Sequence, residues 1–167
     1  MGPYAGIDLV KNIFDMTKAS SDQEHVPLSM ISLPHLIEDR TAFLLGKSQN
    51  NPGIILSEIA MKLIAQGATA IGMPCNTAHS PKIISEIMKR IPKHIIFVNM
   101  IEKVVEHIMK EYQQISKVGI LATSGTLQTK IYDEELENND LIPIVLSEND
   151  QMTLVNPSIY DKGYGIK

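Results

Sequence analysis

Apolar residues follow two alternating patterns along this chain, one typical of helices and one typical of short strands. The first helical stretch, residues 5–17, gathers its large apolar side chains on one face: Ile7, Val10, Ile13 and Phe14. The same spacing predicts further helices at 52–66, 81–90, 101–114, about 126–137 and from about 148 onward. Short apolar runs predict strands at 26–33, 69–73, 94–100, 117–125 and 142–146. Such alternation is typical of βαβ units, so we expect an α/β fold with a parallel, doubly wound sheet covered by helices on both faces.

The chain is long enough to bury a sizeable core, with 167 residues of which 44% are hydrophobic. No linker rich in Pro, Gly and Ser divides it, so we predict no domain boundary within residues 1–167. A doubly wound domain commonly begins with a strand, whereas this chain opens on Met-Gly-Pro and a helix, and it stops at GYGIK, at or inside a helix. We therefore expect that a first strand and a C-terminal portion are missing.

Composition and charge narrow the class of partners. The net charge of −4 and the absence of a basic run argue against nucleic acid as a partner. No apolar run reaches the roughly 18–20 residues that span a bilayer, and the N-terminus lacks the features of a signal peptide. One cysteine and scattered histidines give no zinc-ligand spacing. We expect a cytoplasmic protein without a membrane segment or a metal.

The only cysteine, Cys75, lies in the sequence GMPCNTAH directly after the predicted strand 69–73. A lone cysteine is often a small buried core residue, and that interpretation is the first alternative. In open parallel α/β sheets, however, ligands bind beyond the carboxyl ends of the strands. Residues 123–126, TSGT, follow strand 117–125 in the same way, so both loops are expected at one edge of the sheet. This placement favours a functional thiol.

The residues after Cys75 suit an anion. Asn76 and Thr77 are predicted to begin a helix, whose N-terminal amides favour the thiolate and a substrate carboxylate. Thr123 and Thr126 in the second loop suit another carboxylate, although a plain helix cap by Thr123 or Ser124 explains that loop equally well. His79 is either a general base or a structural side chain, and its place four residues after Cys75 favours the structural role.

Two cations are candidates for binding a carboxylate. Arg40, in the sequence EDRT, could hold a carboxylate with its guanidinium fork. Lys167 closes the chain in YGIK. From the bare sequence, a solvated surface position is the ordinary interpretation of each.

Taken together, these motifs resemble the aspartate/glutamate racemase family, whose members use neither pyridoxal phosphate nor a metal. The resemblance is carried by MPCNTAH and LATSGT in this order and spacing, supported by MGP, DQEH and DRT upstream and KIYDEEL downstream. It extends from Met1 to Lys167.

The resemblance implies two pseudo-symmetric α/β domains, of which this chain would hold the first and part of the second, usually within a homodimer. It implies that one cysteine thiolate removes the α-proton of the amino acid while a second thiol reprotonates the opposite face. Inverting a stereocentre through a planar carbanion needs an acid and a base on opposite sides. The substrate would be aspartate, or alternatively glutamate, and no cofactor would be needed.

Residue by residue, the resemblance makes Cys75 the catalytic cysteine of the first half. It places the following residues near the substrate: Met1, Gly2, Arg40, Asn76, Thr77, Thr123, Thr126 and Lys167. Lys162 competes with Lys167 for the role of the lysine that follows the IY motif.

Two departures from the family pattern leave alternatives open. The strand expected before Met-Gly-Pro is absent, and so is the second cysteine, which the family carries in a Gly-Cys-Thr-Glu motif farther downstream. Truncation explains both absences most simply, and this chain alone would then lack its second base. The alternatives are a single-cysteine decarboxylase or isomerase of the same superfamily, and an inactive fragment that binds a dicarboxylate.

Overall fold

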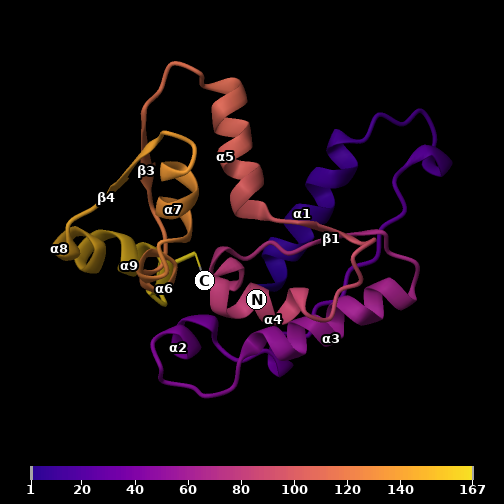
Figure 1. Cartoon of the computed structure of the whole chain (residues 1–167), viewed down its shortest axis with the longest axis horizontal. Coiled ribbons are helices and arrows are strands. Elements are labelled where there is room, and N and C mark those ends of the chain that lie inside the picture. Colours follow the sequence, from indigo (N-terminus) through magenta and orange to yellow (C-terminus); the bar gives the residue numbers. More distant parts are fainter. Residues whose placement is uncertain (1, 167) are drawn as a thin grey trace.

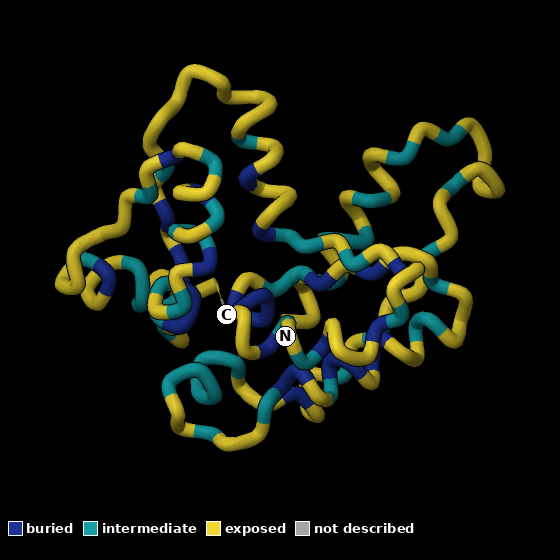
Figure 2. Tube along the Cα trace, viewed as in Figure 1, coloured by how far each residue is buried: buried dark blue, intermediate teal, exposed yellow. Residues whose placement is uncertain are grey.

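The first helix, α1 (Pro3–Met16), forms where the helical spacing predicts it, two residues earlier than expected. It belongs to a computed structural model that describes residues 2–166. Pro3 suits the first turn, where a backbone N–H would have no partner inside the helix. None of its residues is buried, and Ile7 on the apolar face remains 54% exposed. The tube in Figure 2 shows α1 without a buried position.

Residues 26–33, predicted as a strand, form no strand in the structure, so that prediction is wrong. The segment is extended and leads into a short 3₁₀ turn at Pro34–Leu36. Pro27 has no backbone N–H to offer, and none of the described strands pairs with this segment. Its apolar residues Ile31 and Leu33 instead pack against the first core cluster, which explains the strand-like composition.

The first βα unit contains α3 (Pro52–Ala65), β1 (Ala70–Gly72), α4 (Pro81–Met88) and β2 (Ile96–Val98). Asn51 caps α3 by accepting a hydrogen bond from the N–H of Gly53 at 2.9 Å. Strands β1 and β2 pair in parallel, with Ile71 opposite Phe97. Helices α3 and α4 lie side by side (Figure 1) and enclose the first core cluster, which includes Leu56, Ile83 and Ile87.

The second βα unit begins with α5 (Met100–Glu111) and continues through β3 (Lys117–Ile120), α6 (Ser124–Gln128), α7 (Ile131–Glu137) and β4 (Ile142–Val145). Strands β3 and β4 are also parallel, from Lys117 opposite Ile142 to Ile120 opposite Val145. The second core cluster comprises Val105, Ile120, Ala122, Leu136 and Leu141.

The helix predicted at about 126–137 is two helices, because the backbone turns between them. Lys130 adopts a left-handed conformation with φ of 51°, which ends α6 and starts α7 in a new direction. The final helical segment begins at the predicted place, with α8 (Glu148–Asp150), a π-helical turn (Gln151–Val155) and α9 (Asn156–Tyr160). The buried amide of Gln151 donates to the carbonyl of Ala122 at 2.9 Å and so holds this segment against the end of β3.

The α/β class with parallel strands is confirmed. The described strands pair as two separate two-stranded sheets, β1 with β2 and β3 with β4. Several strand side chains remain open to solvent, with Ile96 64% and Ile142 50% exposed. Among the described helices, none has the length and apolar character needed to cross a membrane.

Candidate active site

Three segments far apart in the sequence meet beside the carboxyl ends of β1 and β3. They are the loop after β1, the loop after β3, and the short helix α2 (Arg40–Leu44). The hydroxyls of Thr77 and Thr126 lie 2.9 Å apart across the two loops, and both residues are buried. Helix α2 comes so close to the second loop that a Cβ on Gly125 would lie 2.6 Å from the Thr41 hydroxyl. The two loops therefore meet, as predicted, although each follows a strand of a different two-stranded sheet.

Cys75 is half-buried and lies at the end of the extended segment, with φ of −156° and ψ of 105°. A helix begins directly after it, as predicted, but it is a single short turn and not an α-helix. A single 3₁₀ turn, Asn76–His79, follows, and α4 begins only at Pro81. The cause is Pro81, which disfavours the helical conformation of the residue before it, and Ser80 accordingly has ψ of 144°.

His79 holds this loop in place. It is 4% exposed, and its Nδ1 donates to the carbonyl oxygen of Cys75 at 2.9 Å. Its Nε2 accepts a hydrogen bond from the backbone N–H of Met100 at 3.2 Å, so both ring nitrogens have a backbone partner. Burial lowers the pKa of His79, which keeps the ring neutral. These contacts favour the structural role over that of a general base.

A cleft of about 480 Å³ opens in front of Cys75. The loop after β1 and the start of α5 provide Pro74, Cys75, Asn76 and Met100, and α1 provides Ala5, Asp8, Leu9 and Asn12. Asp8 and Cys75 are the titratable residues among them. The prediction missed Asp8 and Asn12. Positions 5, 8, 9 and 12 nevertheless share one helical face, and this spacing was visible in the sequence.

Asn76 shares the cleft with Cys75 and has a partner from the second βα unit. The phenol of Tyr132, on α7, donates to Oδ1 of Asn76 at 2.8 Å. Tyr132 belongs to the KIYDEEL motif, but nothing in the local sequence indicated that it would reach Asn76. Burial raises the pKa of Tyr132, so its hydroxyl stays protonated.

Thr123 caps α6, with its hydroxyl accepting from the N–H of Thr126 at 3.4 Å, as the capping alternative predicts. It also lies 3.2 Å from the Thr126 hydroxyl. Thr77, Thr123 and Thr126 therefore form a hydroxyl network, but none of them lines the cleft.

Arg40 lies beside this network. Its Nη1 donates to the carbonyl of Glu38 at 3.3 Å, while its buried Nε has no protein acceptor in residues 2–166. Tyr160 on α9 is close by. Desolvation raises the pKa of its phenol, and the Asp39 carboxylate adds to this, while Thr123 and Arg40 oppose it.

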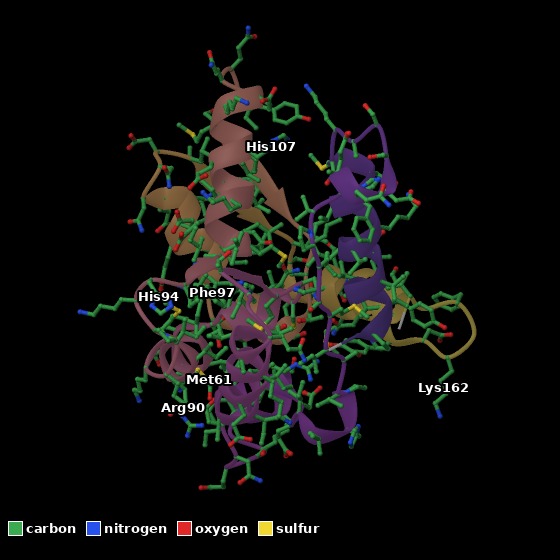
Figure 3. All side chains as sticks on the ribbon, turned by 90° about the vertical axis from the view of Figure 1, so that its right-hand side faces the viewer. Met61, Arg90, His94, Phe97, His107 and Lys162 are labelled. Carbon is green, nitrogen blue, oxygen red and sulfur yellow. The ribbon has the colours of Figure 1, made fainter. Side chains whose placement is uncertain are left out.

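Of the remaining predicted binders, Gly2 is described by the structure and is not part of the cleft lining. Gly2 is an exposed residue that caps the start of α1. Met1 and Lys167 lie outside the described residues. Lys162, the competitor of Lys167, is exposed and points away from the body of the molecule (Figure 3). Within residues 2–166, no three His, Cys, Asp or Glu side chains are grouped so that they could hold a metal ion.

Comparison with known proteins gives a consistent result. The sequence profile of the Asp/Glu/hydantoin racemase family matches residues 1–159. The solved structure of Picrophilus torridus aspartate racemase is 25% identical and superposes with a TM-score of 0.75, over 93% of this chain and 63% of that one. An aspartate racemase homologue from Pyrococcus horikoshii OT3 has the same fold, at 22% identity and a TM-score of 0.69, over 95% of this chain and 66% of that one. The chain thus spans less than two thirds of the length of the Picrophilus protein.

Proposed function

Because this chain belongs to the Asp/Glu/hydantoin racemase family, we propose that it acts on the α-carbon of an acidic amino acid, aspartate or alternatively glutamate. The observation that carries the proposal is the placement of Cys75 in an open cleft beside the carboxamide of Asn76. The thiolate of Cys75 is the base that removes the α-proton. The electron pair of the broken C–H bond moves into the substrate carboxylate, and N–H donors beside that carboxylate stabilise the developing charge.

Inversion of the α-carbon needs a second proton donor on the opposite face. In the proposed mechanism this donor is a second thiol. Cys75 is the only cysteine in these 167 residues, so the second thiol is not supplied by them. We expect this chain alone to exchange the α-proton on one face and to invert the substrate slowly or not at all.

The charge of the cleft favours an amino acid over a malonate-type dianion, the substrate of a single-thiol decarboxylase. Asp8 lines the same cleft as Cys75. A carboxylate at this position attracts the ammonium group of an amino acid, a group that a malonate-type dianion lacks. Arg40 is the proposed partner of the distal carboxylate because its buried Nε has no acceptor among the described residues, although Arg40 is not one of the residues that line the cleft.

The proposal extends to the state of the protein in the cell. We propose a cytoplasmic homodimer that works without pyridoxal phosphate. Addition of pyridoxal phosphate, or of a carbonyl reagent that traps it, is expected to leave the reaction rate unchanged.

Solvent deuterium tests the reaction. The chain is incubated in D₂O with L-aspartate, D-aspartate or either enantiomer of glutamate, and NMR follows loss of the Cα proton while chiral chromatography follows inversion. We expect exchange with wild type and none with Cys75→Ser. Asp8→Asn should slow exchange of the amino acid by about 2- to 5-fold, as expected for loss of one ion pair at a solvent-exposed position.

Other outcomes select the alternatives. Decarboxylation of a malonate derivative, with deuterium on one face of the product, would identify the single-thiol decarboxylase. If no exchange occurs and Cys75→Ser binds aspartate as tightly as wild type, the chain is only a dicarboxylate-binding unit.

A further inference from the structure

The hydroxyl of Tyr132 joins the second βα unit to the loop that carries Cys75. Its side chain packs against the second core cluster. Its phenol oxygen lies 2.8 Å from Oδ1 of Asn76. This hydrogen bond joins two residues that are 56 positions apart in the sequence.

The contact determines which end of the Asn76 carboxamide already has a protein partner and which end is left for a ligand. An asparagine side chain presents an acceptor oxygen on one side and a donor nitrogen on the other. The Tyr132 hydroxyl occupies the oxygen. Across residues 2–166, no protein group accepts a hydrogen bond from Nδ2 of Asn76, so its two N–H groups are available to a ligand.

We propose that Tyr132 is a positioning residue that holds the Asn76 carboxamide with its nitrogen available to a carboxylate bound next to Cys75. The inference rests on the proposed function, because it assigns this carboxylate to the substrate. Without the phenol, the carboxamide can rotate and present its oxygen, which repels a carboxylate. The hydroxyl of Tyr132 touches neither the thiol nor the reacting carbon in this role.

The protonation state of Tyr132 suits it to the role. Burial of the phenol raises its pKa above the ordinary value, so it donates across the neutral and moderately alkaline range. Its anchor in the second core cluster means that the ring itself is fixed by packing rather than by the bond to Asn76. Removing the hydroxyl alone therefore changes the hydrogen bond and leaves the ring in place.

Alkylation of Cys75 tests the orientation directly, because it is the only thiol of the chain. Iodoacetate carries a carboxylate, whereas iodoacetamide is neutral, so the ratio of their rate constants measures how well the cleft attracts a carboxylate. We expect Tyr132→Phe to lower this ratio by about 3- to 10-fold, the range for one lost hydrogen bond. The rate with iodoacetamide alone should stay close to wild type.

Three further variants separate positioning from a general structural effect. Tyr112→Phe removes the hydroxyl of a tyrosine that is 56% exposed, and it should keep the wild-type ratio. Asn76→Ala should lower the ratio, and adding Tyr132→Phe to it should lower the ratio no further. An unchanged ratio in Tyr132→Phe, or a further loss in the double variant, would overturn the proposal.

Protection of wild-type Cys75 by D- or L-aspartate tests the underlying function separately. If neither enantiomer nor glutamate slows alkylation while the ratio still depends on Tyr132, the acidic amino acid is rejected as ligand. The orientation of Asn76 by Tyr132 would stand in that case. If an acidic amino acid protects Cys75 but the iodoacetate-to-iodoacetamide ratio does not depend on Tyr132, the proposed function is supported and the positioning role of Tyr132 is rejected.

Discussion

A histidine four residues from the candidate nucleophile is easily interpreted as its base, and here the local contacts argue otherwise. Both ring nitrogens of His79 bond to backbone groups, one in the loop of Cys75 and one at the start of α5. The ring therefore joins the catalytic loop to the next helix. The neutral ring maintains the conformation of this loop. A proton on both nitrogens would remove the acceptor that the N–H of Met100 needs.

Stability should depend on pH through His79. Its native pKa lies below the ordinary 6.5, so above that pH neither the folded nor the unfolded chain carries the proton. As the pH falls through 6.5, the unfolded chain binds the proton first and stability is lost. The melting temperature of wild type should therefore exceed that of His79→Gln by more at pH 7.5 than at pH 5.5.

The exposed His94 provides the control, since its side chain lies at the surface (Figure 3). His94→Gln is expected to follow the wild-type pH dependence. A difference between wild type and His79→Gln that stays constant from pH 7.5 to 5.5 would contradict the assignment of a neutral buried ring.

At the scale of elements, helix packing determines whether a glycine can be replaced by alanine without loss of stability, as two glycines illustrate. Gly53 lies in the first turn of α3 against α4, where an added Cβ would come within 2.6 Å of the Ile83 carbonyl oxygen and 2.9 Å of Glu86 Cβ. Gly6 in α1 would place its Cβ 3.2 Å from the sulfur of Met30, a flexible side chain. Both are helical glycines, yet only Gly53 permits a close approach of two backbones.

Replacing each by alanine should separate intrinsic helix propensity from packing. Gly53→Ala is expected to lower the free energy of unfolding by about 1–3 kcal/mol, because α3 and α4 must move apart. Gly6→Ala should leave it unchanged or raise it by up to about 1 kcal/mol, the usual gain over glycine in a helix. Urea denaturation measures both. Equal effects of the two substitutions would contradict the close packing of α3 and α4.

Periodicity was sufficient to predict most elements but not their partners. The helical spacing of α1, α3 and α5 and the apolar runs of β1 to β4 are local properties, so they were predictable. Residues 26–33 have strand-like composition, but none of the described strands pairs with them, and the sequence of a segment does not reveal whether a partner strand lies beside it. The break at Lys130 depends on one left-handed backbone angle that composition does not reveal.

In the candidate site too, some residues were predictable from the sequence and others were not. The order of strands and loops placed Cys75 and the threonines at one edge, and this was predictable from the topology. Asp8 lines the cleft only because α1 and the Cys75 loop face the same space, and Tyr132 bonds to Asn76 only because α7 lies beside it. Both depend on tertiary packing. The helix predicted to begin at Asn76 is only a 3₁₀ turn, because Pro81 keeps Ser80 out of the helical conformation, and α4 begins at Pro81, where the sequence predicts a helix.

For the whole molecule, the exposed apolar surface of the strands has a consequence for association. Ile96 and Ile142, on the first and second strand pair, are 64% and 50% exposed. Exposed apolar side chains of this size favour contact with another protein surface. We expect the chain to associate with a second copy, in accord with the proposed homodimer.

Sedimentation velocity over a tenfold range of concentration should show a weight-average sedimentation coefficient that rises with concentration. Substituting Ile96→Lys together with Ile142→Lys should weaken the rise. Gln113→Lys, which adds positive charge at an exposed polar position, provides a control for charge and should behave as wild type. A monomer at all concentrations would contradict self-association.

The buried pair of hydroxyls between the two βα units also limits which sequences this fold can accept. Thr126 has two hydroxyl neighbours, Thr77 and Thr123, whereas the Thr77 side chain bonds to Thr126 alone among the described residues. Loss of the Thr126 hydroxyl therefore leaves the buried Thr77 hydroxyl without a hydrogen-bond partner. Loss of the Thr77 hydroxyl leaves the Thr126 hydroxyl still bonded to Thr123. The order of substitution therefore matters: a valine at position 126 is tolerated only after Thr77 has been replaced by a residue without a hydroxyl.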